Sequence, residues 1–558
     1  MHLCRVMTGR LLMAFVLTAC VAAPVVPTVA PTAAPAASAA VIRAGAPADT
    51  LRWSIEGVSD LASLDPAKAG DNPTVTVVNL IFGGLLRLNE SLEVQPNDAA
   101  SWVVSEDGKT YTFTLREGLV FADGTAVTAA DYVFSINRAI QPETGSFIAP
   151  GQFSGIRGAQ QVISGSADMA SGLRSLDDRT LQIELVAPSA AFLQLLTFPS
   201  TAVVPRQLSA QDGWAEQQPF GTGPYVVKSW TRGESILLAA NERYWQGKPG
   251  VPLINISFSS ESATAYERYL AGQLDIMGSL QNPLPASMLP AVAGLPDFRT
   301  SASLNTRYIG FNNLLPPFNS DDARRAFALA VDRFAIANQV LGGEAIAAER
   351  ILPPQMIGTR LPIRPIVFDP DAARAALEQA GFSSGAALPP ITLTYAPEGG
   401  ENELVIQALQ QGWKQYLDVD VVLQAVDATQ LGELMTQTRK TPEQGLQMYY
   451  SVWGADYADP QNFISQQLHS GSPNNNGHFS DSRFDRLVEE ADQIGARSDI
   501  QRRLLLYNQA EQIAIDRVGW LPILHSKVHM LLHPRVQGLV VTPNGTVVPD
   551  WSKLRLSE

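Results

Sequence analysis

The sequence predicts an α/β protein with two lobes, and three observations lead to this prediction. The chain has 558 residues, which is long enough for more than one hydrophobic core. Patterns of strands and turns dominate up to about residue 305. From about residue 306 onward, helical patterns alternate with strand patterns, which is typical of a parallel-rich sheet covered by helices. We expect the chain to cross between the lobes near residues 306 and 524, with a ligand cleft between them.

The N-terminal residues follow the order of a secretory signal peptide, in which positive charges precede an apolar run. Arg5 and Arg10 precede an apolar run at residues 11–17, which is too short to be a membrane span. The run leads into Leu-Thr-Ala-Cys, ending at Cys20, and this resembles a bacterial lipobox. In such lipoproteins the leader is cut before the cysteine, and the cysteine carries the lipid. We therefore expect residues 1–19 to be a signal peptide and Cys20 to be lipidated; the alternative is a chance cysteine in an ordinary signal.

Residues 20–50 are predicted to be a tether. They are almost wholly Ala, Pro, Val and Thr, a composition that buries no core and favours an extended chain. With a lipid at its start, such a tether holds the folded body at the outer face of the cytoplasmic membrane, in the periplasm or at the cell surface.

Elements of the first lobe are expected to be mainly strands. Residues 111, 113 and 115 are apolar or aromatic and alternate with threonines, which predicts a half-buried strand. Thr128 is placed to cap the helix that follows. Residues 220–225 (FGTGPY) lack the third glycine and the lysine of phosphate-binding loops, so we interpret them as a backbone turn. The other expected elements are strands at 51–55, 181–185, 235–239 and 254–258, a helix at 75–82 and a turn at 107–108.

In the second lobe, helices are expected to alternate with strands. Asp321 or Asp322 is expected to cap one long helix at 323–340. Asp369 is expected to cap the next helix, which Gly381 ends. The remaining helices are predicted at 404–416, 431–438, 482–494 and 499–516, and the strands at 391–395, 419–426 and 446–453, with the last forty residues returning to strand character.

Two aspartates follow the aromatic strand at 446–453. Gly454 ends this strand, and Asp456 and Asp459 come directly after it in a turn-rich segment closed by Pro460. Open α/β sheets hold ligands beyond the carboxyl ends of their strands. We therefore predict that Asp456 receives a positively charged group of a ligand. The alternative is that both residues are turn and helix-cap aspartates.

Composition and the motif search limit the classes of function. The formal net charge is −14, and an acidic surface repels nucleic acid, so we expect no nucleic-acid partner. The only two cysteines lie in the first twenty residues, so the rest of the chain can form no thiolate metal site. No nucleophile, zinc-protease or nucleotide-binding motif occurs, which predicts a protein that is not an enzyme and needs no cofactor.

Five histidines were considered as ligands of a metal or a solute. His525, His529 and His533 are spaced by four, but their context predicts a strand, where that spacing spans about 13 Å and is too long for one ion. We therefore predict no metal site there. His469 and His478 lie in a loop rich in Gly, Asn and Ser, where they are either solvated or in contact with a ligand.

Several segments resemble one family along most of the chain. They are SLDPAKA (63–69), EDGKTYTFTLREGLVFADG (106–124), FGTGPY (220–225), FNNLLPPFNSDDARRAFALAVDR (311–333), LPP (352–354), DYADPQNF (456–463) and WLPI (520–523). In this order and spacing they resemble the extracellular solute-binding proteins, family 5, which serve ABC importers of dipeptides, oligopeptides and nickel. The match runs from about Leu51 to the C-terminus.

The resemblance implies a periplasmic-binding-protein-like fold of type II with an extra domain in the first lobe. It implies a first lobe at 51–305 with the extra domain at about 90–217, a second lobe at 306–524, and a return to the first lobe at 525–558. Such proteins are monomers that close around a solute like a hinged trap. They deliver the solute to a permease in the cytoplasmic membrane.

The resemblance also implies a set of binding residues. In peptide-binding members an aspartate at the position of Asp456 receives the α-ammonium of the ligand, a strong charge-assisted contact. By the same match, Trp453, Gly454 and Ala455 offer backbone groups to the ligand, although a plain core aromatic is the alternative for Trp453. The opposite wall is expected to include Gly70, Asp71 and Asn72.

One departure from the family bears on the ligand. Dipeptide-binding members place an arginine for the ligand carboxylate just after the strand that matches 391–395. Here residues 396–401 read APEGGE, with two acids and no base. We therefore expect oligopeptides rather than dipeptides. A nickel chelate or an oligosaccharide is the alternative within the binding class, and an envelope hydrolase is the alternative outside it.

Overall fold

The structure is a computed structural model that describes residues 49–557 except 190, 260, 279–283, 285, 398–399 and 496–498, and it leaves undescribed the side chains of Asn72 and Ala286. The predicted signal peptide, Cys20 and most of the predicted tether therefore lie outside the described residues. In the part that the structure describes, no helix is both long enough and apolar enough to cross a bilayer.

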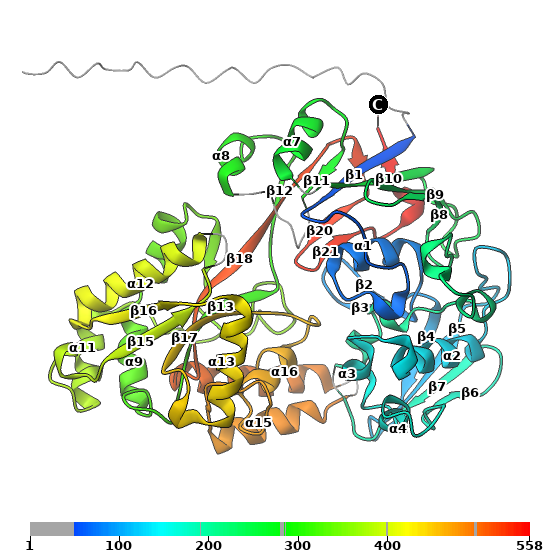
Figure 1. The fold of residues 1–558 in the computed structure, drawn as a ribbon. Coiled ribbons are helices and arrows are strands. Elements are labelled where there is room, and N and C mark those ends of the chain that lie inside the picture. The colour runs from blue at the N-terminus through cyan, green and yellow to red at the C-terminus, as the bar shows by residue number, and fades with distance from the viewer. Residues whose placement is uncertain are drawn as a thin grey trace, which may run out of the picture. The chain divides into compact units, whose positions relative to one another are not determined.

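One mixed sheet connects both parts of the described chain (Figure 1). Its path runs in the order β16-β15-β17-β13-β18-β11-β1-β10-β9-β8, and β12 and β14 also pair with β18. The strands are β1 (Thr50–Glu56), β8 (Tyr225–Thr231), β9 (Ser235–Ala240), β10 (Leu253–Ser259), β11 (Ile276–Met277), β12 (Phe298–Ala302), β13 (Asn305–Phe311), β14 (Ala345–Ala347), β15 (Ile391–Tyr395), β16 (Val421–Ala425), β17 (Met448–Gly454) and β18 (Trp520–Leu532).

Strand β18 passes from one half of this sheet to the other. Its first residues pair with β13 and β14, up to Ser526, and its last residues, from Lys527, pair with β12 and β11. The chain also passes between the halves at residues 303–304, which connect β12 to β13. Two connections therefore run side by side at this crossing, where the N–H of Ser303 donates a hydrogen bond of 2.8 Å to the carbonyl oxygen of Ser526.

The half of the sheet that contains β1 is parallel only where β1 meets β10 and β11. Leu51, Trp53 and Ile55 alternate into its core, which α1 (Asn72–Ile81) covers. Helix α1 starts where Asp71 accepts a hydrogen bond from the backbone of Thr74, 2.9 Å away, and Pro73 occupies its first turn. This start lies three residues before the predicted one.

A second sheet lies in residues 99–184 and has its own core. It is antiparallel, in the order β4 (Ala99–Val104), β5 (Thr110–Leu115), β7 (Thr180–Glu184) and β6 (Leu173–Ser175). Tyr111 and Phe113 are buried at alternate positions of β5, as the alternation with threonine predicts. Helix α2 (Ala129–Ile140) packs on them and begins at the predicted cap, Thr128, which forms a capping box with Asp131.

In the half that contains β17, strand β15 is parallel to β16 and β17, but β17 is antiparallel to β13. The prediction of a parallel-rich lobe is therefore only partly right. The reason is topological: β13 enters directly from the crossing, so it runs opposite to the strands that helices connect. Helices α12 (Glu401–Leu417) and α13 (Ala428–Lys440) make these connections. The other main helices of this half are α9 (Asp321–Leu329), α11 (Pro370–Gln379), α15 (Ser482–Asp492) and α16 (Ile500–Asp516).

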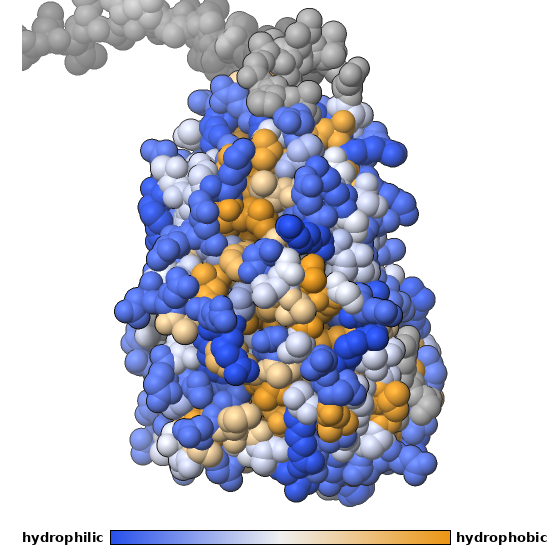
Figure 2. All heavy atoms as spheres, turned by 90° about the vertical axis from the view of Figure 1, so that its right-hand side faces the viewer, coloured by the Kyte–Doolittle hydropathy of each residue, from blue (hydrophilic) through white to orange (hydrophobic). Residues whose placement is uncertain are grey.

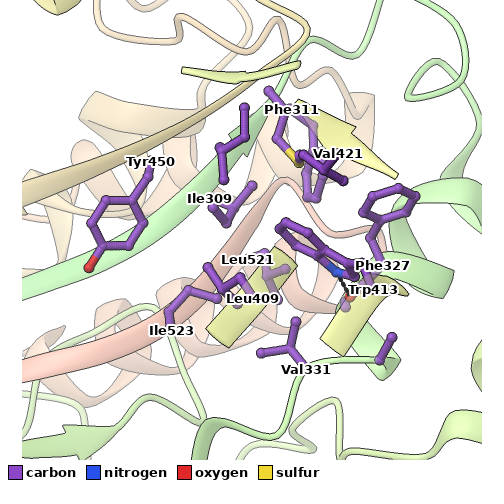
Figure 3. Close-up of a cluster of buried hydrophobic side chains, with 14 of the residues drawn as sticks. Ile309, Phe311, Phe327, Val331, Leu409, Trp413, Val421, Tyr450, Leu521 and Ile523 are labelled. Atoms are coloured by element: carbon purple, nitrogen blue, oxygen red, sulfur yellow. Dashed lines mark hydrogen bonds between the residues drawn. The ribbon is translucent and has the colours of Figure 1, made fainter. Parts of the chain in front are cut away.

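The core under α12 shows how this half is held together (Figure 3). Trp413 on α12 is fully buried among Phe327, Val421 and Leu521. Its indole Nε1 donates a hydrogen bond of 3.0 Å to the carbonyl oxygen of Phe327 at the end of α9. A large apolar ring with a satisfied polar atom therefore joins two helices and the sheet.

The prediction of a single long helix at 323–340 is wrong. Helix α9 ends at Leu329, and the chain restarts as α10 (Arg333–Ala335) and a π-helical turn, η6 (Ile336–Val340). The restart has a local cause, because the Asp332 carboxylate accepts a hydrogen bond from the backbone of Ala335. The cap of α9 is Ser320 rather than either aspartate.

The surface is mainly hydrophilic with scattered apolar patches on the face that carries β8 and β9 (Figure 2). Isolated apolar residues are common on protein surfaces. This face therefore gives no reason by itself to expect a partner.

Candidate functional site

The end of β17 lies against the crossing between the two halves of the sheet. Gly454 pairs with Asn305 on β13. The backbone N–H of Ala455 then donates a hydrogen bond of 2.8 Å to the carbonyl oxygen of Leu304, which lies between β12 and β13. The segment that the sequence singles out is therefore placed directly beside the crossing, beyond the carboxyl ends of β15 and β17.

Asp456 is exposed, and its carboxylate is held in a defined position. Oδ2 of Asp456 accepts a hydrogen bond of 3.0 Å from Nδ2 of Asn462, and the backbone N–H of Asp456 donates to Oδ1 of Asn462 at 3.1 Å. Asn462 is fully buried, so it is a rigid support. Because a cation can still approach the exposed carboxylate, this arrangement suits an acceptor for a ligand ammonium.

Asp459 has a different role from Asp456. Its Oδ1 accepts a hydrogen bond of 3.0 Å from the backbone of Gln461, and it forms a salt bridge with Arg503 on α16. Both side chains of this pair are only 3% exposed. For Asp459 the structure thus supports the turn-and-cap interpretation.

Trp453 and Ala455 are already engaged by the protein. The indole Nε1 of Trp453 donates to Oδ1 of Asn462 at 3.1 Å, and its half-buried ring packs on the core beneath α15 and α16. The N–H of Ala455 donates its hydrogen bond to the carbonyl oxygen of Leu304. Gly454 is exposed at the last position of β17.

The three residues expected on the opposite wall are only partly described. Gly70 is exposed, and a Cβ placed there would lie 3.5 Å from Ile148. The side chain of Asp71 caps α1 through Thr74, so a structural role accounts for it. The side chain of Asn72 lies outside the described residues.

The histidines considered from sequence are engaged separately. His525 and His529 lie on β18, as the strand context predicts, and His533 follows it. Nδ1 of His525 lies 3.1 Å from the carbonyl oxygen of Asn305, and burial lowers the pKa of His525 to about 4. His469 lies beside Glu489, and Nε2 of His478 lies 3.0 Å from the carbonyl oxygen of Thr438.

Asn462 was not among the predicted binding residues, although it lies only six residues after Asp456. Its amide organises three groups at once: the indole of Trp453, and the backbone and carboxylate of Asp456. The spacing of six residues does not fit a helix, and no strand joins Asp456 to Asn462, because β17 ends at Gly454. The short 3₁₀ turn η9 (Pro460–Asn462), which Asp459 caps, folds the amide back.

A cavity of about 280 Å³ lies elsewhere, beneath α1. Its walls are mainly apolar and include Trp53, Phe82, Met530 and Trp551. The residues that line it include none of the candidate binding residues, so we assign the site by the geometry around Asp456 and not by this cavity.

Comparison with known proteins decides the family. A family model described as "Bacterial extracellular solute-binding proteins, family 5 Middle" matches residues 93–475. The chain belongs to this family. It is therefore the substrate-binding component of an ABC transporter, acts outside the cytoplasm, and belongs to a class of binding proteins rather than enzymes.

Two curated relatives match nearly the whole chain. The probable deoxycholate-binding periplasmic protein YgiS of Escherichia coli (strain K12) is 32% identical over 513 residues, which cover 88% of this chain and 91% of the relative. The periplasmic oligopeptide-binding protein OppA of Salmonella typhimurium is 31% identical over 496 residues, which cover 86% of this chain and 88% of the relative. The family predicted from sequence is confirmed.

The solved structures confirm the α/β binding-protein fold. The unliganded open form of the periplasmic murein tripeptide binding protein MppA is 28% identical, with a TM-score of 0.78 over 90% of this chain and 96% of that one. A second structure of Escherichia coli MppA gives a TM-score of 0.65 over 91% of this chain and 99% of that one, at 26% identity.

Proposed function

We propose that this family 5 protein captures peptides, most suitably oligopeptides, and delivers them to a permease. One observation carries the proposal: the exposed Asp456 carboxylate is held by buried Asn462 beside the crossing between the two halves of the sheet. Because the carboxylate is already held in place, binding of an incoming ammonium does not carry the entropy cost of ordering this side chain.

The described state suits capture of a solute. The TM-score is 0.78 against the unliganded open form of MppA and 0.65 against the second MppA structure. We infer that the lobes are in the open arrangement. A solute that contacts both lobes then stabilises the closed arrangement, by the difference between its affinity for the closed arrangement and its affinity for the open one.

Replacing Asp456 with alanine is expected to weaken binding of a free peptide amine by about 10- to 100-fold. The reason is the loss of a charge-assisted contact of about 1.5–3 kcal/mol. The measurement is calorimetry with tri-alanine and with N-acetylated tri-alanine. The wild type is expected to prefer the free amine, and Asp456→Ala is expected to bind both peptides equally.

The matched control for this experiment is Asp420→Ala, which removes an exposed carboxylate from the same half of the sheet. It is expected to keep the preference for the free amine. Mass spectrometry of the small molecules released from the denatured proteins gives a second readout. Equal recovery of amine-bearing ligands from the wild type and from Asp456→Ala would show that Asp456 is not the anchor.

A bile acid is the second candidate solute, because the relative at 32% identity is named for deoxycholate binding. Deoxycholate carries a carboxylate and no amine. Its binding would therefore be insensitive to Asp456→Ala, and the same calorimeter can compare it with tri-alanine.

The tether and lipid are also part of the proposal, on the strength of the lipobox-like residues 17–20. Replacing Cys20 with serine is expected to move the protein from the membrane fraction to the soluble extracytoplasmic fraction, because the lipid attachment atom is lost. Immunoblotting of fractionated cells measures this. Replacing Cys4 with serine is the control, and we expect that variant to stay at the membrane. Membrane retention of Cys20→Ser would contradict the anchor.

A further inference from the structure

A polar cavity of about 210 Å³ lies where the chain crosses between the two halves of the sheet. Residues on both sides of the crossing form it: β13 and the start of α12 on one side, and the part of β18 that pairs with β12 on the other. It is lined by Leu284, Leu289, Ser303, Asn305, Arg307, Glu344, Ala345, Glu401, Ser526, Lys527, Val528 and His529.

Arg307 is a cation of this cavity whose guanidinium is only partly paired. Its Nη2 lies 3.2 Å from Oε2 of Glu401. Its Nη1 is buried and makes no well-formed hydrogen bond, although the Tyr450 hydroxyl is near enough to interact with the guanidinium. A buried donor left in this way beside a cavity suggests a group that is bound there during function.

The other charged groups that line the cavity contact protein atoms. Nζ of Lys527 donates a hydrogen bond of 2.6 Å to the carbonyl oxygen of Gly343. Nε2 of His529 lies 2.8 Å from Oε2 of Glu344. Lys527 also keeps donors to spare, but Arg307 is the one described lining residue that offers an anion the planar, forked donors of a guanidinium.

The position of Arg307 also resolves the difficulty at residues 396–401. That segment contains two acids and no base, which argues against a ligand carboxylate there. Arg307 on β13 forms an ion pair with Glu401 at the end of that segment, so a cation from elsewhere in the chain lies beside it. On the strand ladder Arg307 is opposite Val452, four residues before Asp456.

We propose that Arg307 receives the carboxylate of the solute in this cavity, so that the protein selects solutes with an amine at one end and a carboxylate at the other. This inference rests on the proposed peptide-binding function. A planar guanidinium offers parallel donors that match the two oxygens of a carboxylate, so it binds a carboxylate better than an ammonium of the same charge does. Arg307 is thus a specificity-determining residue for the anionic end of the solute.

The test compares tri-alanine with tri-alanine amide by calorimetry on the intact protein. We expect the wild type to bind the free carboxylate at least about 10-fold more tightly, and Arg307→Gln to bind both peptides equally. Arg307→Gln should keep its preference for tri-alanine over N-acetylated tri-alanine, because Asp456 is untouched. The control is Arg325→Gln, which removes an exposed arginine of α9 and should keep both preferences.

The outcomes separate this inference from the proposed function. If the wild type does not discriminate between the carboxylate and the amide, or if Arg307→Gln still discriminates, Arg307 is not the receptor. If the carboxylate preference is present but the amine preference is absent, the inference stands and the role of Asp456 fails. No binding of tri-alanine by the wild type overturns both.

A second variant keeps the test decisive if Arg307→Gln does not fold. Glu401→Gln removes the competing carboxylate and leaves Arg307 in place, so it is expected to increase the preference for tri-alanine over its amide. An unchanged preference in Glu401→Gln would overturn the proposal.

Discussion

Replacing Arg503 with methionine is expected to lower the free energy of unfolding by about 3–5 kcal/mol. Methionine retains much of the aliphatic packing of Arg503, but it leaves the Asp459 carboxylate buried without its counter-ion. An isolated buried charge costs far more than the pair itself contributes. Urea denaturation followed by fluorescence measures the change in the midpoint.

This prediction also reaches the candidate site. Asp459 caps the turn η9 that places Asn462 against Asp456, so weakening the cap should disorder the support of the Asp456 carboxylate. The double variant Asp459→Asn with Arg503→Met removes the stranded charge and should recover most of the lost stability. The control is Arg374→Met, which breaks an exposed pair with Asp371 and should cost less than about 1 kcal/mol. Equal losses for Arg503→Met and Arg374→Met would contradict the prediction.

Replacing Asp275 with asparagine is expected to have an effect of similar size, again about 3–5 kcal/mol at neutral pH. The fully buried carboxylate accepts hydrogen bonds from Arg52 on β1 and from Arg535 beyond β18, at 2.7–3.0 Å. It therefore ties the first strand of the described chain to the segment that returns after β18. The variant leaves both guanidinium groups without a charged partner.

The same carboxylate should make stability depend on pH. Burial alone would raise the pKa of Asp275, but hydrogen bonds from Arg52 and Arg535 hold the pKa below its ordinary value. A depressed pKa in the folded state means that the stabilisation is complete above the pKa of the unfolded chain, near 4, and is lost as the pH falls further. Denaturation at pH 7 and at pH 3 should show a smaller acid-induced loss in Asp275→Asn than in the wild type. Equal losses would contradict this assignment.

Local sequence signals predicted many of the elements because their causes are local. The Asp369-Pro370 start gives α11 at the expected place, and Gly381 has the positive φ of +93° that a helix end of this kind requires. The strand at 391–395 has the predicted limits. The alternation of β5 and the cap at Thr128 are also as predicted.

Other features depend on contacts between distant residues, and the sequence pattern could not reveal them. The apolar pattern continues past Leu329, where the helix breaks; Asp332 caps the restart locally, and buried Arg333 then fixes it by donating hydrogen bonds to the carbonyl oxygens of Pro522 and Ile366, which are remote in sequence. Asp456 and Asp459 are equivalent as turn residues in sequence. The structure separates them, because only Asp459 meets an arginine from α16.

The sequence by itself determined the family, the fold class and the aspartate at the end of the aromatic strand, because these follow from local patterns and motifs along the chain. Only the tertiary structure decided which aspartate is exposed and which is buried in an ion pair, which amide holds the exposed one, and that Arg307 lies against Glu401. Those properties depend on burial and on the pairing of residues about 6 to 94 positions apart, which strand register and helix packing bring together.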